Sequence, residues 1–264
     1  MLKHRHKMPA VWRIALVTSL VLWTATAAVA AGEGVDPEAD RILRSMSTYL
    51  GGLTAFSVAA DIDDEVIDLA GQKLQLSGSG TLAVERPGHF FARRQGPLAD
   101  VELFFDGQTL TLHGKRQNVF VQIEAPGTID DAVTQLRAQT GLDAPAGDLF
   151  YADPYPGLMT DVTSGTYQGT AYVNGIECHH LAFRAAKVDW QIWVQTGDRP
   201  LPMKYVITTK WLTGAPQYAV RFRDWNAAPA LEPDRFKFTP PQGARQLDRL
   251  SVDALGALVF AEDL

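Results

Sequence analysis

The sequence predicts a mainly β protein with a few helices, an α+β class in which one long antiparallel sheet curls on itself. About nine or ten segments alternate apolar with polar residues, as expected for strands that bury one face. Asp106-Gly107 and Asn174-Gly175 separate such segments, and both pairs are typical of tight hairpin turns. Strands and helices do not alternate regularly, so a parallel sheet is not expected, and an antiparallel sheet this long must curl or close.

Residues 1–30 are predicted to be a secretory signal peptide. Lys3, Arg5 and Lys7 give a basic start, an uncharged run follows from residue 14 to 31, and Ala28-Val29-Ala30 fits a cleavage site. The alternative is a membrane anchor, because the run is about long enough to span a bilayer. Its second half is only weakly apolar, which favours cleavage, export to the periplasm and no stable membrane anchor afterwards. Residues 31–264 are then expected to form a single domain.

Charge excludes one class of partner. The 264 residues contain 24 basic and 30 acidic side chains, and cleavage would remove four basic residues and no acidic one. The remaining 20 basic and 30 acidic residues carry a net charge of −10, and nucleic acid is not an expected partner because phosphate binding needs clustered basic residues. Cys178 is the only cysteine, so no internal disulfide is available and stability must come from the core.

Two helices are expected among the strands. Asp36-Pro37 is typical of a helix start, apolar residues then recur at helical spacing, and Gly51-Gly52 ends the segment. Thr128 and Asp131 fit a capping box at the start of a second helix, for which Gly141 is the expected end. The alternating segments from which about nine or ten strands are expected lie within residues 56–62, 74–84, 101–105, 110–112, 119–123, 167–173, 176–185, 190–195, 203–210, 218–225 and 235–238.

Three further segments carry weaker signals. Gly78 and Gly80 lie inside an expected strand and suggest a bend or bulge there. Residues 144–157 are rich in Pro, Gly and Tyr, which predicts a loop or lid with short local structure. The tail, residues 247–264, has a weak helical spacing.

The triplet Cys178-His179-His180 is the most reactive-looking segment. In a strand, Cys178 and His180 share one face and could supply two metal ligands, while His179 points to the other face. A small buried cysteine beside hydrogen-bonded histidines is the more ordinary interpretation, because a reactive cysteine needs a lowered pKa. No metal and no cofactor are expected.

The remaining chemical signals are sparse. Asp61, Asp63, Asp64 and Glu65 begin like a calcium loop, but Val66 occupies the position that requires glycine, so a solvated strand end is expected. The sequence contains no nucleophile elbow, no zinc-protease motif, no phosphate-binding loop and no dinucleotide fingerprint. The chain is therefore not expected to be an enzyme.

Apolar side chains on several strands either fill an ordinary core or line a cavity for a small apolar ligand. The sequence alone does not separate a filled core from a hollow one. The candidate cavity residues are Phe105, Leu112, Phe183, Trp190, Ile192, Tyr218 and Phe222.

The C-terminal half carries a resemblance to a known family. Residues 178–183 (CHHLAF), 189–193 (DWQIW), 199–204 (RPLPMK) and 236–244 (FKFTPPQGA) appear in this order. They resemble an uncharacterised family of predicted periplasmic proteins of Gram-negative bacteria, over about residues 36–247. That family is similar to the lipoprotein-carrier (LolA/LolB-like) superfamily, which also includes sensor domains of anti-sigma-factor regulators. The resemblance implies a half-open barrel with helices covering its concave face, and no carrier cavity residue can be matched by position.

Three functions follow as hypotheses. The first is a soluble periplasmic binding protein for a lipid or acyl chain in an apolar cavity. The second is a cell-envelope module that binds or senses another protein, which exposed aromatics such as Trp193 or Trp225 would favour. The third is an enzyme that uses Cys178, His179 or His180.

Overall fold

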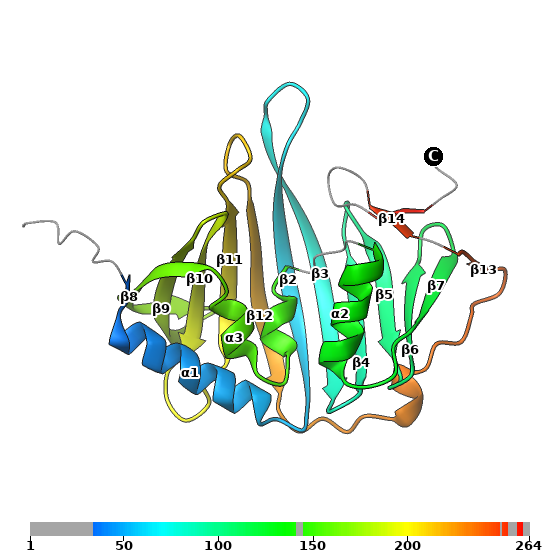
Figure 1. The fold of residues 1–264 in the computed structure, drawn as a ribbon, viewed down its shortest axis with the longest axis horizontal. Helices are drawn as coiled ribbons and strands as arrows, with labels where there is room; N and C mark the ends of the chain where they lie inside the picture. Colours follow the sequence, from blue (N-terminus) through cyan, green and yellow to red (C-terminus); the bar gives the residue numbers. More distant parts are fainter. Residues whose placement is uncertain (1–33, 141–144, 249, 253–257, 261–264) are drawn as a thin grey trace, which may run out of the picture. The chain divides into compact units, whose positions relative to one another are not determined.

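A computed structural model of the chain describes residues 34–140, 145–248, 250–252 and 258–260. All of them belong to Glu33–Leu264, one of the two compact units into which the chain divides. Within this unit a long, curved sheet forms a wall, and three α-helices lie against one side of it (Figure 1). The predicted signal peptide and the expected end of the second helix at Gly141 lie outside the described residues.

The sheet consists of two antiparallel meanders joined side by side. The first meander comprises β2 (Ala55–Ile67), β3 (Lys73–Glu85), β4 (His89–Gln95), β5 (Asp100–Phe105), β6 (Thr109–Gly114) and β7 (Val119–Glu124). The second comprises β8 (Val162–Val173), β9 (Ile176–Ala185), β10 (Val188–Gln195), β11 (Pro202–Thr209) and β12 (Gln217–Asn226). The last strand, β12, returns to pair with β2, so strands far apart in sequence meet in the middle of the sheet.

Two short strands lie at the ends of the sheet. β1 (Gly34–Val35) pairs in parallel with β8, and β13 (Arg245–Gln246) pairs in parallel with β7. Because these two ends do not pair with each other among the described residues, the sheet curves without closing into a barrel. β14 (Leu250–Val252) and β15 (Leu258–Phe260) form a separate two-stranded sheet.

The hairpin turns follow from local side-chain chemistry. Asp106 Oδ1 accepts hydrogen bonds from the amides of Gln108 (3.0 Å) and Thr109 (2.8 Å), which closes the turn between β5 and β6. Asn174 and Gly175 have φ angles of 51° and 78°, the left-handed conformation that a two-residue hairpin requires. Both predicted hairpins are confirmed.

The first helix, α1 (Pro37–Gly51), begins where the sequence predicts. The Asp36 carboxylate accepts a 2.8 Å hydrogen bond from the amide of Glu38, and Pro37 occupies the first turn. One side of the helix is buried against the sheet by Ala39, Ile42, Leu43, Met46, Ser47 and Leu50.

The capping box predicted for the second helix, α2 (Ile129–Thr140), is present. The amide of Thr128 donates to the Asp131 carboxylate at 2.9 Å, and the amide of Asp131 donates to Thr128 Oγ1 at 3.2 Å. The described part of the Pro- and Tyr-rich segment forms a 3₁₀ turn, η1 (Gly147–Phe150), and a short helix, α3 (Pro154–Leu158).

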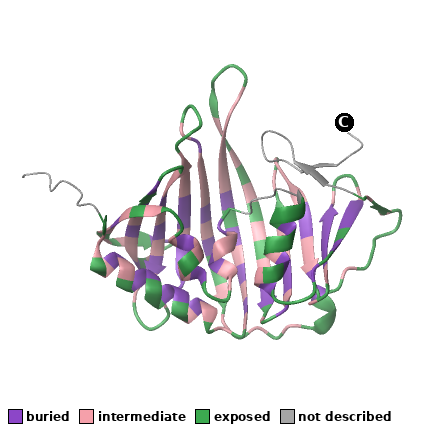
Figure 2. Cartoon of the chain, in the orientation of Figure 1, coloured by how far each residue is buried: buried purple, intermediate pink, exposed green. Residues whose placement is uncertain are grey.

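The main core lies between the helices and one face of the sheet, which we call the concave face. Buried residues run along the middle of the strands, whereas the β2–β3 hairpin tip is exposed (Figure 2). The opposite, convex face has a smaller core in which Phe236 packs on Ala83 and Phe91. The predicted fold class, a mainly β protein with a strongly curved antiparallel sheet and helices over its concave face, is confirmed.

Two local predictions were wrong, and the structure excludes one of the two alternatives of a third. Residues 235–238 are not a strand, because Pro233–Phe236 forms a 3₁₀ turn, η2, that buries Phe236 under the convex face. The described parts of the tail form short strands rather than a helix, and the amide of Leu247 donates to the carbonyl oxygen of Phe120 at the sheet edge. Of the bend or bulge expected at Gly78 and Gly80, the bulge is excluded, because β2 and β3 pair without a register shift. A Cβ at Gly78 would lie 2.9 Å from the carbonyl oxygen of Gln95, so close strand approach explains this glycine.

Candidate functional site

The concave face of the second meander is lined by a row of aromatic side chains. Phe183 and Trp190 are directly paired on β9 and β10, and their rings stack with centroids 4.1 Å apart. Trp190 also meets the ring of Tyr205 on β11 edge to face, at 5.6 Å. These contacts form because alternate residues of neighbouring strands point to the same side.

Two neighbouring cavities lie between this face and the segment Pro145–Thr160, which we call the cover. The larger cavity has a volume of about 350 Å³ and is lined mainly by Trp190, Tyr205, Ile207, Leu158 and other apolar side chains. The smaller cavity, about 110 Å³, lies over β2, β3 and β12 and is lined in part by Ile62, Val220 and Phe222. Pro145, Ala146 and Tyr218 line both cavities, so they form the partition between them.

Of the seven candidate residues, three line a cavity and four are packed in hydrophobic clusters. Trp190 lines the larger cavity, Phe222 lines the smaller one, and Tyr218 lines both. Phe105, Phe183 and Ile192 are fully buried in the main core and line neither cavity. Leu112 belongs to a separate small cluster with Val101 and Val119. All seven residues face the same side of the sheet, but only three of them reach a cavity.

Hydrogen bonds attach the cover to the β3–β4 hairpin and to α2. Arg86, at the end of the β3–β4 hairpin, donates hydrogen bonds to the carbonyl oxygens of Phe150 (3.1 Å) and Tyr151 (3.0 Å). Asp130 of α2 accepts a 3.1 Å hydrogen bond from the amide of Ala152. Burial lowers the pKa of the Arg86 guanidinium, while the nearby Asp130 carboxylate opposes that shift, so the arginine stays charged at neutral pH.

The helix α1 holds the other end of the cover. The Tyr155 hydroxyl donates a hydrogen bond to the Asp40 carboxylate and accepts one from Arg44 (2.7 Å). The Arg44 guanidinium also lies 3.8 Å above the Tyr155 ring. The cover is therefore attached to α1, α2 and the β3–β4 hairpin, which keeps the space beneath it open rather than collapsed.

Two phenols stand out among the apolar walls of the larger cavity. Tyr205 is only 6% exposed, and neither its hydroxyl nor that of Tyr218 has a hydrogen-bond partner among the described residues. Burial raises the pKa of Tyr218 to about 12 and raises the pKa of Tyr205 further, so both phenols are neutral at physiological pH. Among the described residues, the charged side chains on the wall of this cavity are Arg137 and Asp148, which form an ion pair with an N···O distance of 3.4 Å.

Each side chain of the triplet 178–180 is packed or hydrogen-bonded within the protein. Cys178 is fully buried, its thiol donates to the carbonyl oxygen of Ile176 (3.4 Å), and burial raises its pKa to about 11. The His180 ring stacks on Trp193 at 4.1 Å and its Nε2 lies 2.9 Å from Gln191 Oε1, while the His179 Nδ1 lies 3.1 Å from the hydroxyl of Tyr167. No group of three or more possible metal ligands occurs among the residues the structure describes.

The acidic cluster is not a solvated strand end, which corrects the prediction. Asp61, Asp63 and Glu65 lie on one face of β2 and Asp64 on the other, and each carboxylate pairs with a basic residue outside β2. The ion pairs are Asp61–Arg223, Asp63–Arg221, Asp64–Arg94 and Glu65–Lys73. These ion pairs connect β2 to other strands of the sheet.

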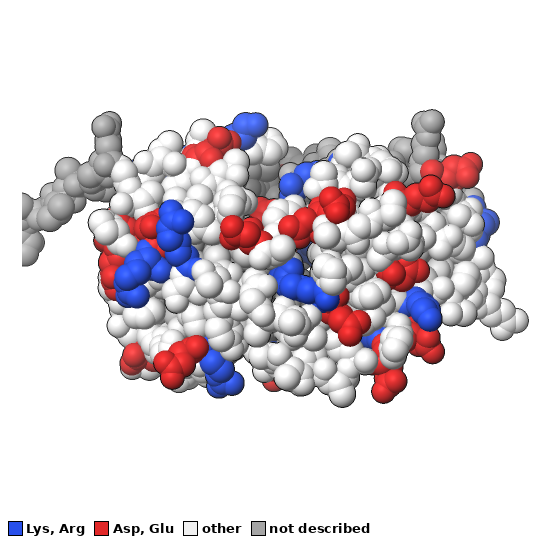
Figure 3. All heavy atoms as spheres, turned by 60° about the horizontal axis from the view of Figure 1, so that its bottom comes forward, with Lys and Arg blue, Asp and Glu red and all other residues white. Residues whose placement is uncertain are grey.

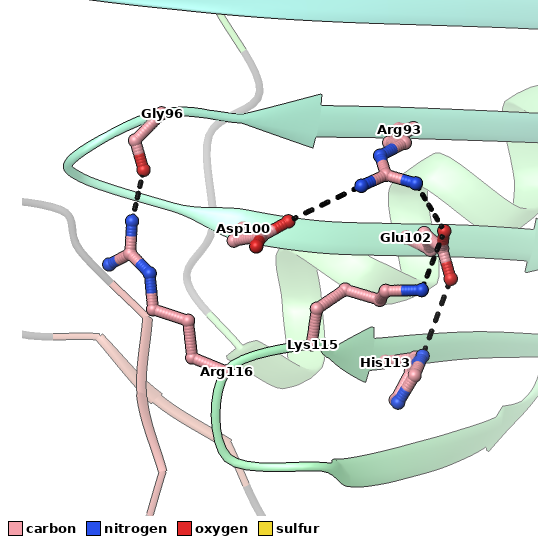
Figure 4. A network of polar contacts seen from close by, with 7 residues as sticks. All are labelled: Arg93, Gly96, Asp100, Glu102, His113, Lys115 and Arg116. Carbon is pink, nitrogen blue, oxygen red and sulfur yellow. Dashed lines mark hydrogen bonds and ion pairs between the residues drawn. The ribbon is translucent and has the colours of Figure 1, made fainter. Parts of the chain in front are cut away.

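The convex face carries a second polar network that sequence analysis missed (Figure 4). Glu102 Oε1 lies 3.2 Å from both Arg93 Nη1 and Lys115 Nζ, and Glu102 Oε2 lies 3.4 Å from the buried His113 Nδ1. Phe238, from the C-terminal segment, packs its ring 5.4 Å from that of His113. The network ties β4, β5 and β6 to the segment that crosses them, so it stabilises the convex face rather than forming an open site.

A third hollow lies on the convex face, between β2, β3 and residues 224–235. Its volume is about 570 Å³, and small side chains such as Ala59 form its floor. Asp224, Glu232 and Arg235 line it, so it is a mixed, charged groove and suits water better than an apolar ligand. The concave cavities are therefore the candidate site for an apolar ligand.

Charges elsewhere are mixed. On the face drawn in Figure 3, basic and acidic side chains are interspersed and much of the surface is uncharged. Exposed ion pairs of opposite charge also occur on α1, such as Arg41–Glu38, with an N···O distance of 2.6 Å. This face offers no broad basic field of the kind that nucleic acid binding requires.

Comparison with protein families decides the relationship. Residues 39–249 match the family model described as "Predicted periplasmic protein (DUF2092)". The chain belongs to this family. Membership of DUF2092 places the protein in the periplasm, in agreement with the predicted export and with the sequence resemblance described above. None of the helices described by the structure is long and apolar enough to cross a membrane.

Solved structures of similar fold share little sequence with this DUF2092 protein, and no curated protein matches it in sequence. An uncharacterized conserved protein from Thermus thermophilus is 11% identical, with a TM-score of 0.49 over 80% of this chain and 99% of its own. LprF from Mycobacterium bovis is 14% identical, with a TM-score of 0.47 over 81% and 100% of the two chains. A LolA superfamily protein from Nitrosomonas europaea is 10% identical, with a TM-score of 0.39 over 76% and 97%.

Proposed function

We propose that this periplasmic protein binds a hydrophobic ligand, a lipid or acyl chain, in the larger cavity beneath the cover. The observation that carries the proposal is the cavity itself, about 350 Å³ between the aromatic concave face and a cover fastened on three sides. Cavities that bind small molecules have volumes of about 300–1,000 Å³ and mostly apolar walls. Each methylene group buried there would contribute about 0.8 kcal/mol. The proposal assigns no catalytic role to any residue and requires no cofactor.

The test is to fill the cavity. Ala185 lies on the cavity wall, so Ala185→Phe places a ring where the ligand would sit. The protein is purified from periplasm without detergent, and native mass spectrometry measures its bound mass. The wild type is expected to carry an excess mass that dissociates as a lipid or acyl species, and Ala185→Phe is expected to lose it.

The matched control is Ala182→Phe, on the same strand but pointing to the convex face. It adds the same ring outside the cavity and should keep the bound species. The proposal fails if the wild type carries no excess mass and also fails to bind the fluorescent apolar probe N-phenyl-1-naphthylamine. It fails equally if both alanine variants bind as the wild type does.

One observation favours a second function, docking to an envelope protein. The β2–β3 and β11–β12 hairpins are joined by the pairing of β12 with β2, and both carry an exposed apolar side chain at the tip: Leu69 is fully exposed and Trp211 is 68% exposed. Trp193 and Trp225, the aromatics singled out for this role in the sequence, are both half-buried. Trp193 is covered by His180, and Trp225 Nε1 donates to the carbonyl oxygen of Pro202.

The docking function is tested by photo-crosslinking in the periplasm. A benzoylphenylalanine at position 211 is expected to form a discrete adduct with another protein. The same residue at position 172, an exposed tyrosine at the β8–β9 turn, should form none. Equal cross-linking at both positions would argue against a specific docking surface at the hairpin tips.

A further inference from the structure

The two phenols in the larger cavity point to the chemistry of its ligand. Tyr205 lies on β11 and Tyr218 on β12, and both face the concave side. Tyr205 is paired with Val220 in the sheet, and Tyr218 is paired with Ile207, so the two tyrosines are diagonal neighbours on one face. Diagonal neighbours lie within reach of each other's long side chains. Both phenols therefore border the same space.

No hydrogen bond from a described residue satisfies either hydroxyl. In the part of the chain that the structure describes, the enclosed side-chain polar atoms without a hydrogen-bond partner are Ser47 Oγ, Arg86 Nε and Asp100 Oδ1, and no tyrosine hydroxyl is among them. The hydroxyls of Tyr205 and Tyr218 therefore border open space in the cavity while making no hydrogen bond to a described residue. A buried tyrosine hydroxyl normally has a partner, because leaving it without one costs free energy. Two such donors on one apolar wall indicate that the occupant supplies the acceptor.

The charged side chains near these phenols indicate whether the acceptor of the ligand is an anion or an uncharged group. Burial is the main cause of the raised pKa of both phenols; the Asp148 carboxylate adds to it at Tyr205, while at Tyr218 the nearby Arg94 lowers the pKa and Asp64 raises it. Asp148 is paired with Arg137, and Asp64 is paired with Arg94, so neither arginine is left to bind an anion alone. Neutral donors in an apolar wall suit an uncharged acceptor such as a carbonyl oxygen.

We infer that the larger cavity recognises an acyl compound by its carbonyl oxygen, which accepts hydrogen bonds from the hydroxyls of Tyr205 and Tyr218, and not a bare hydrocarbon chain. This inference rests on the proposed function and specifies its ligand class. The apolar walls hold the chain, and the two phenols fix the position of the carbonyl group. The tyrosines are thus specificity residues, whereas Trp190 and Ile207 supply contact area.

The test compares two ligands in matched variants. Methyl octanoate carries an ester carbonyl, and nonane has a similar chain without one. Their affinities are measured at pH 7 by displacement of N-phenyl-1-naphthylamine from the wild type, from Tyr205→Phe, from Tyr218→Phe and from the double variant. Phenylalanine keeps the ring packing and removes only the hydroxyl. The control is Tyr172→Phe, which removes an exposed hydroxyl that donates to Glu177 outside the cavity.

Each cavity variant is expected to weaken methyl octanoate about threefold to tenfold, as for one lost hydrogen bond, and to leave nonane unchanged or slightly tighter. Tyr172→Phe should change neither affinity. The stability of the ligand-free variants is a second readout, because removing an unsatisfied hydroxyl should leave the thermal midpoint unchanged or raise it.

Failure of the carbonyl inference and failure of the proposed function give different results. If methyl octanoate and nonane both bind, and the double variant changes both equally or neither, the carbonyl inference is overturned while ligand binding stands. Water in the cavity would then be the partner of the phenols. If neither ligand nor the fluorescent probe binds to the wild type, the proposed function fails, and the inference fails with it.

Discussion

The side chain of Arg86 donates a 3.1 Å hydrogen bond to the carbonyl oxygen of Phe150, a residue 64 positions later in the chain. Its guanidinium also lies 5.9 Å from the centre of the Phe56 ring. Arg86 thereby connects the strand region that forms the floor of the site to the segment that covers it. Half-burying an arginine costs desolvation free energy, because its charge is partly removed from water. Its position indicates that Arg86 helps to fix the distance between the cover and the sheet, and with it the volume of the cavity.

Arg86→Met is expected to lower the free energy of unfolding by about 2 kcal/mol, because two carbonyl oxygens lose a charged donor while the apolar stem is kept. Urea denaturation measures the loss, and hydrogen exchange should show faster exchange in residues 147–158. The control is Arg41→Met, which removes an exposed pair on α1 and should give no measurable change. Equal stability of the two variants would show that Arg86 does not hold the cover.

Gly51→Ala is expected to destabilise the protein, although alanine is the better helix former. A Cβ at Gly51 would lie 2.4 Å from the carbonyl oxygen of Ala152, so the end of α1 or the cover must move. Propensity alone would stabilise the helix by about 1 kcal/mol, and we expect the clash to exceed this and give a net loss of about 1–2 kcal/mol. Ser45→Ala, on the exposed face of the same helix, should instead raise the thermal midpoint slightly. A gain in both variants would contradict the close contact between α1 and the cover.

Local signals predicted local structure well in this chain. The Asp106-Gly107 turn and the capping box at Thr128 and Asp131 depend on residues three or fewer positions apart, and both formed as expected. The pairing of β12 with β2 joins residues more than 150 positions apart, and no short-range pattern records it. Phe236 is a case in which a local pattern predicted the wrong structure. Its alternation with Phe238 looked like a strand, but burial of one ring under the convex face decided the conformation.

The candidate site was only partly predictable for a related reason. Phe183 and Trp190 have the same apolar alternation and stack on each other, yet only Trp190 borders a cavity. Whether an apolar side chain meets another side chain or open space depends on the distance between the cover and the sheet. Contacts between residues far apart in the sequence, such as Arg86 and Phe150, fix that distance. Tyr205 was missed altogether, although a tyrosine among inward-facing apolar residues is the signal that marks a polar group within the site.

Cys178 is expected to be inert in the native protein. Burial raises its thiol pKa to about 11, and only the thiolate reacts rapidly. Iodoacetamide at pH 8 should therefore modify the native protein far more slowly than the urea-unfolded chain, in which the thiol pKa is about 8.5. Mass spectrometry after timed quenching measures both rates. Comparable rates in the two states would show that the thiol is accessible and would revive a reactive role for residues 178–180.

Stability should fall at alkaline pH because of the two cavity tyrosines. Their pKa values are raised in the native state, to about 12 for Tyr218, whereas an unfolded tyrosine titrates near pH 10. Above about pH 10 the unfolded state binds fewer protons than the native state, so the free energy of unfolding decreases with pH. Below about pH 9 both states are protonated, and the tyrosines contribute no slope.

The measurement is urea denaturation from pH 6 to pH 12 in a Cys178→Ala background, which removes the thiol titration from the same range. We expect Tyr205→Phe with Tyr218→Phe to flatten the decline between about pH 10 and pH 12, by up to about 1.4 kcal/mol per pH unit for each phenol. The curves should coincide in shape between pH 6 and pH 9. An unchanged slope above pH 10 in the double variant would mean that the phenols ionise as freely in the native protein as in the unfolded chain. They would then not be the desolvated donors that the carbonyl-binding inference requires.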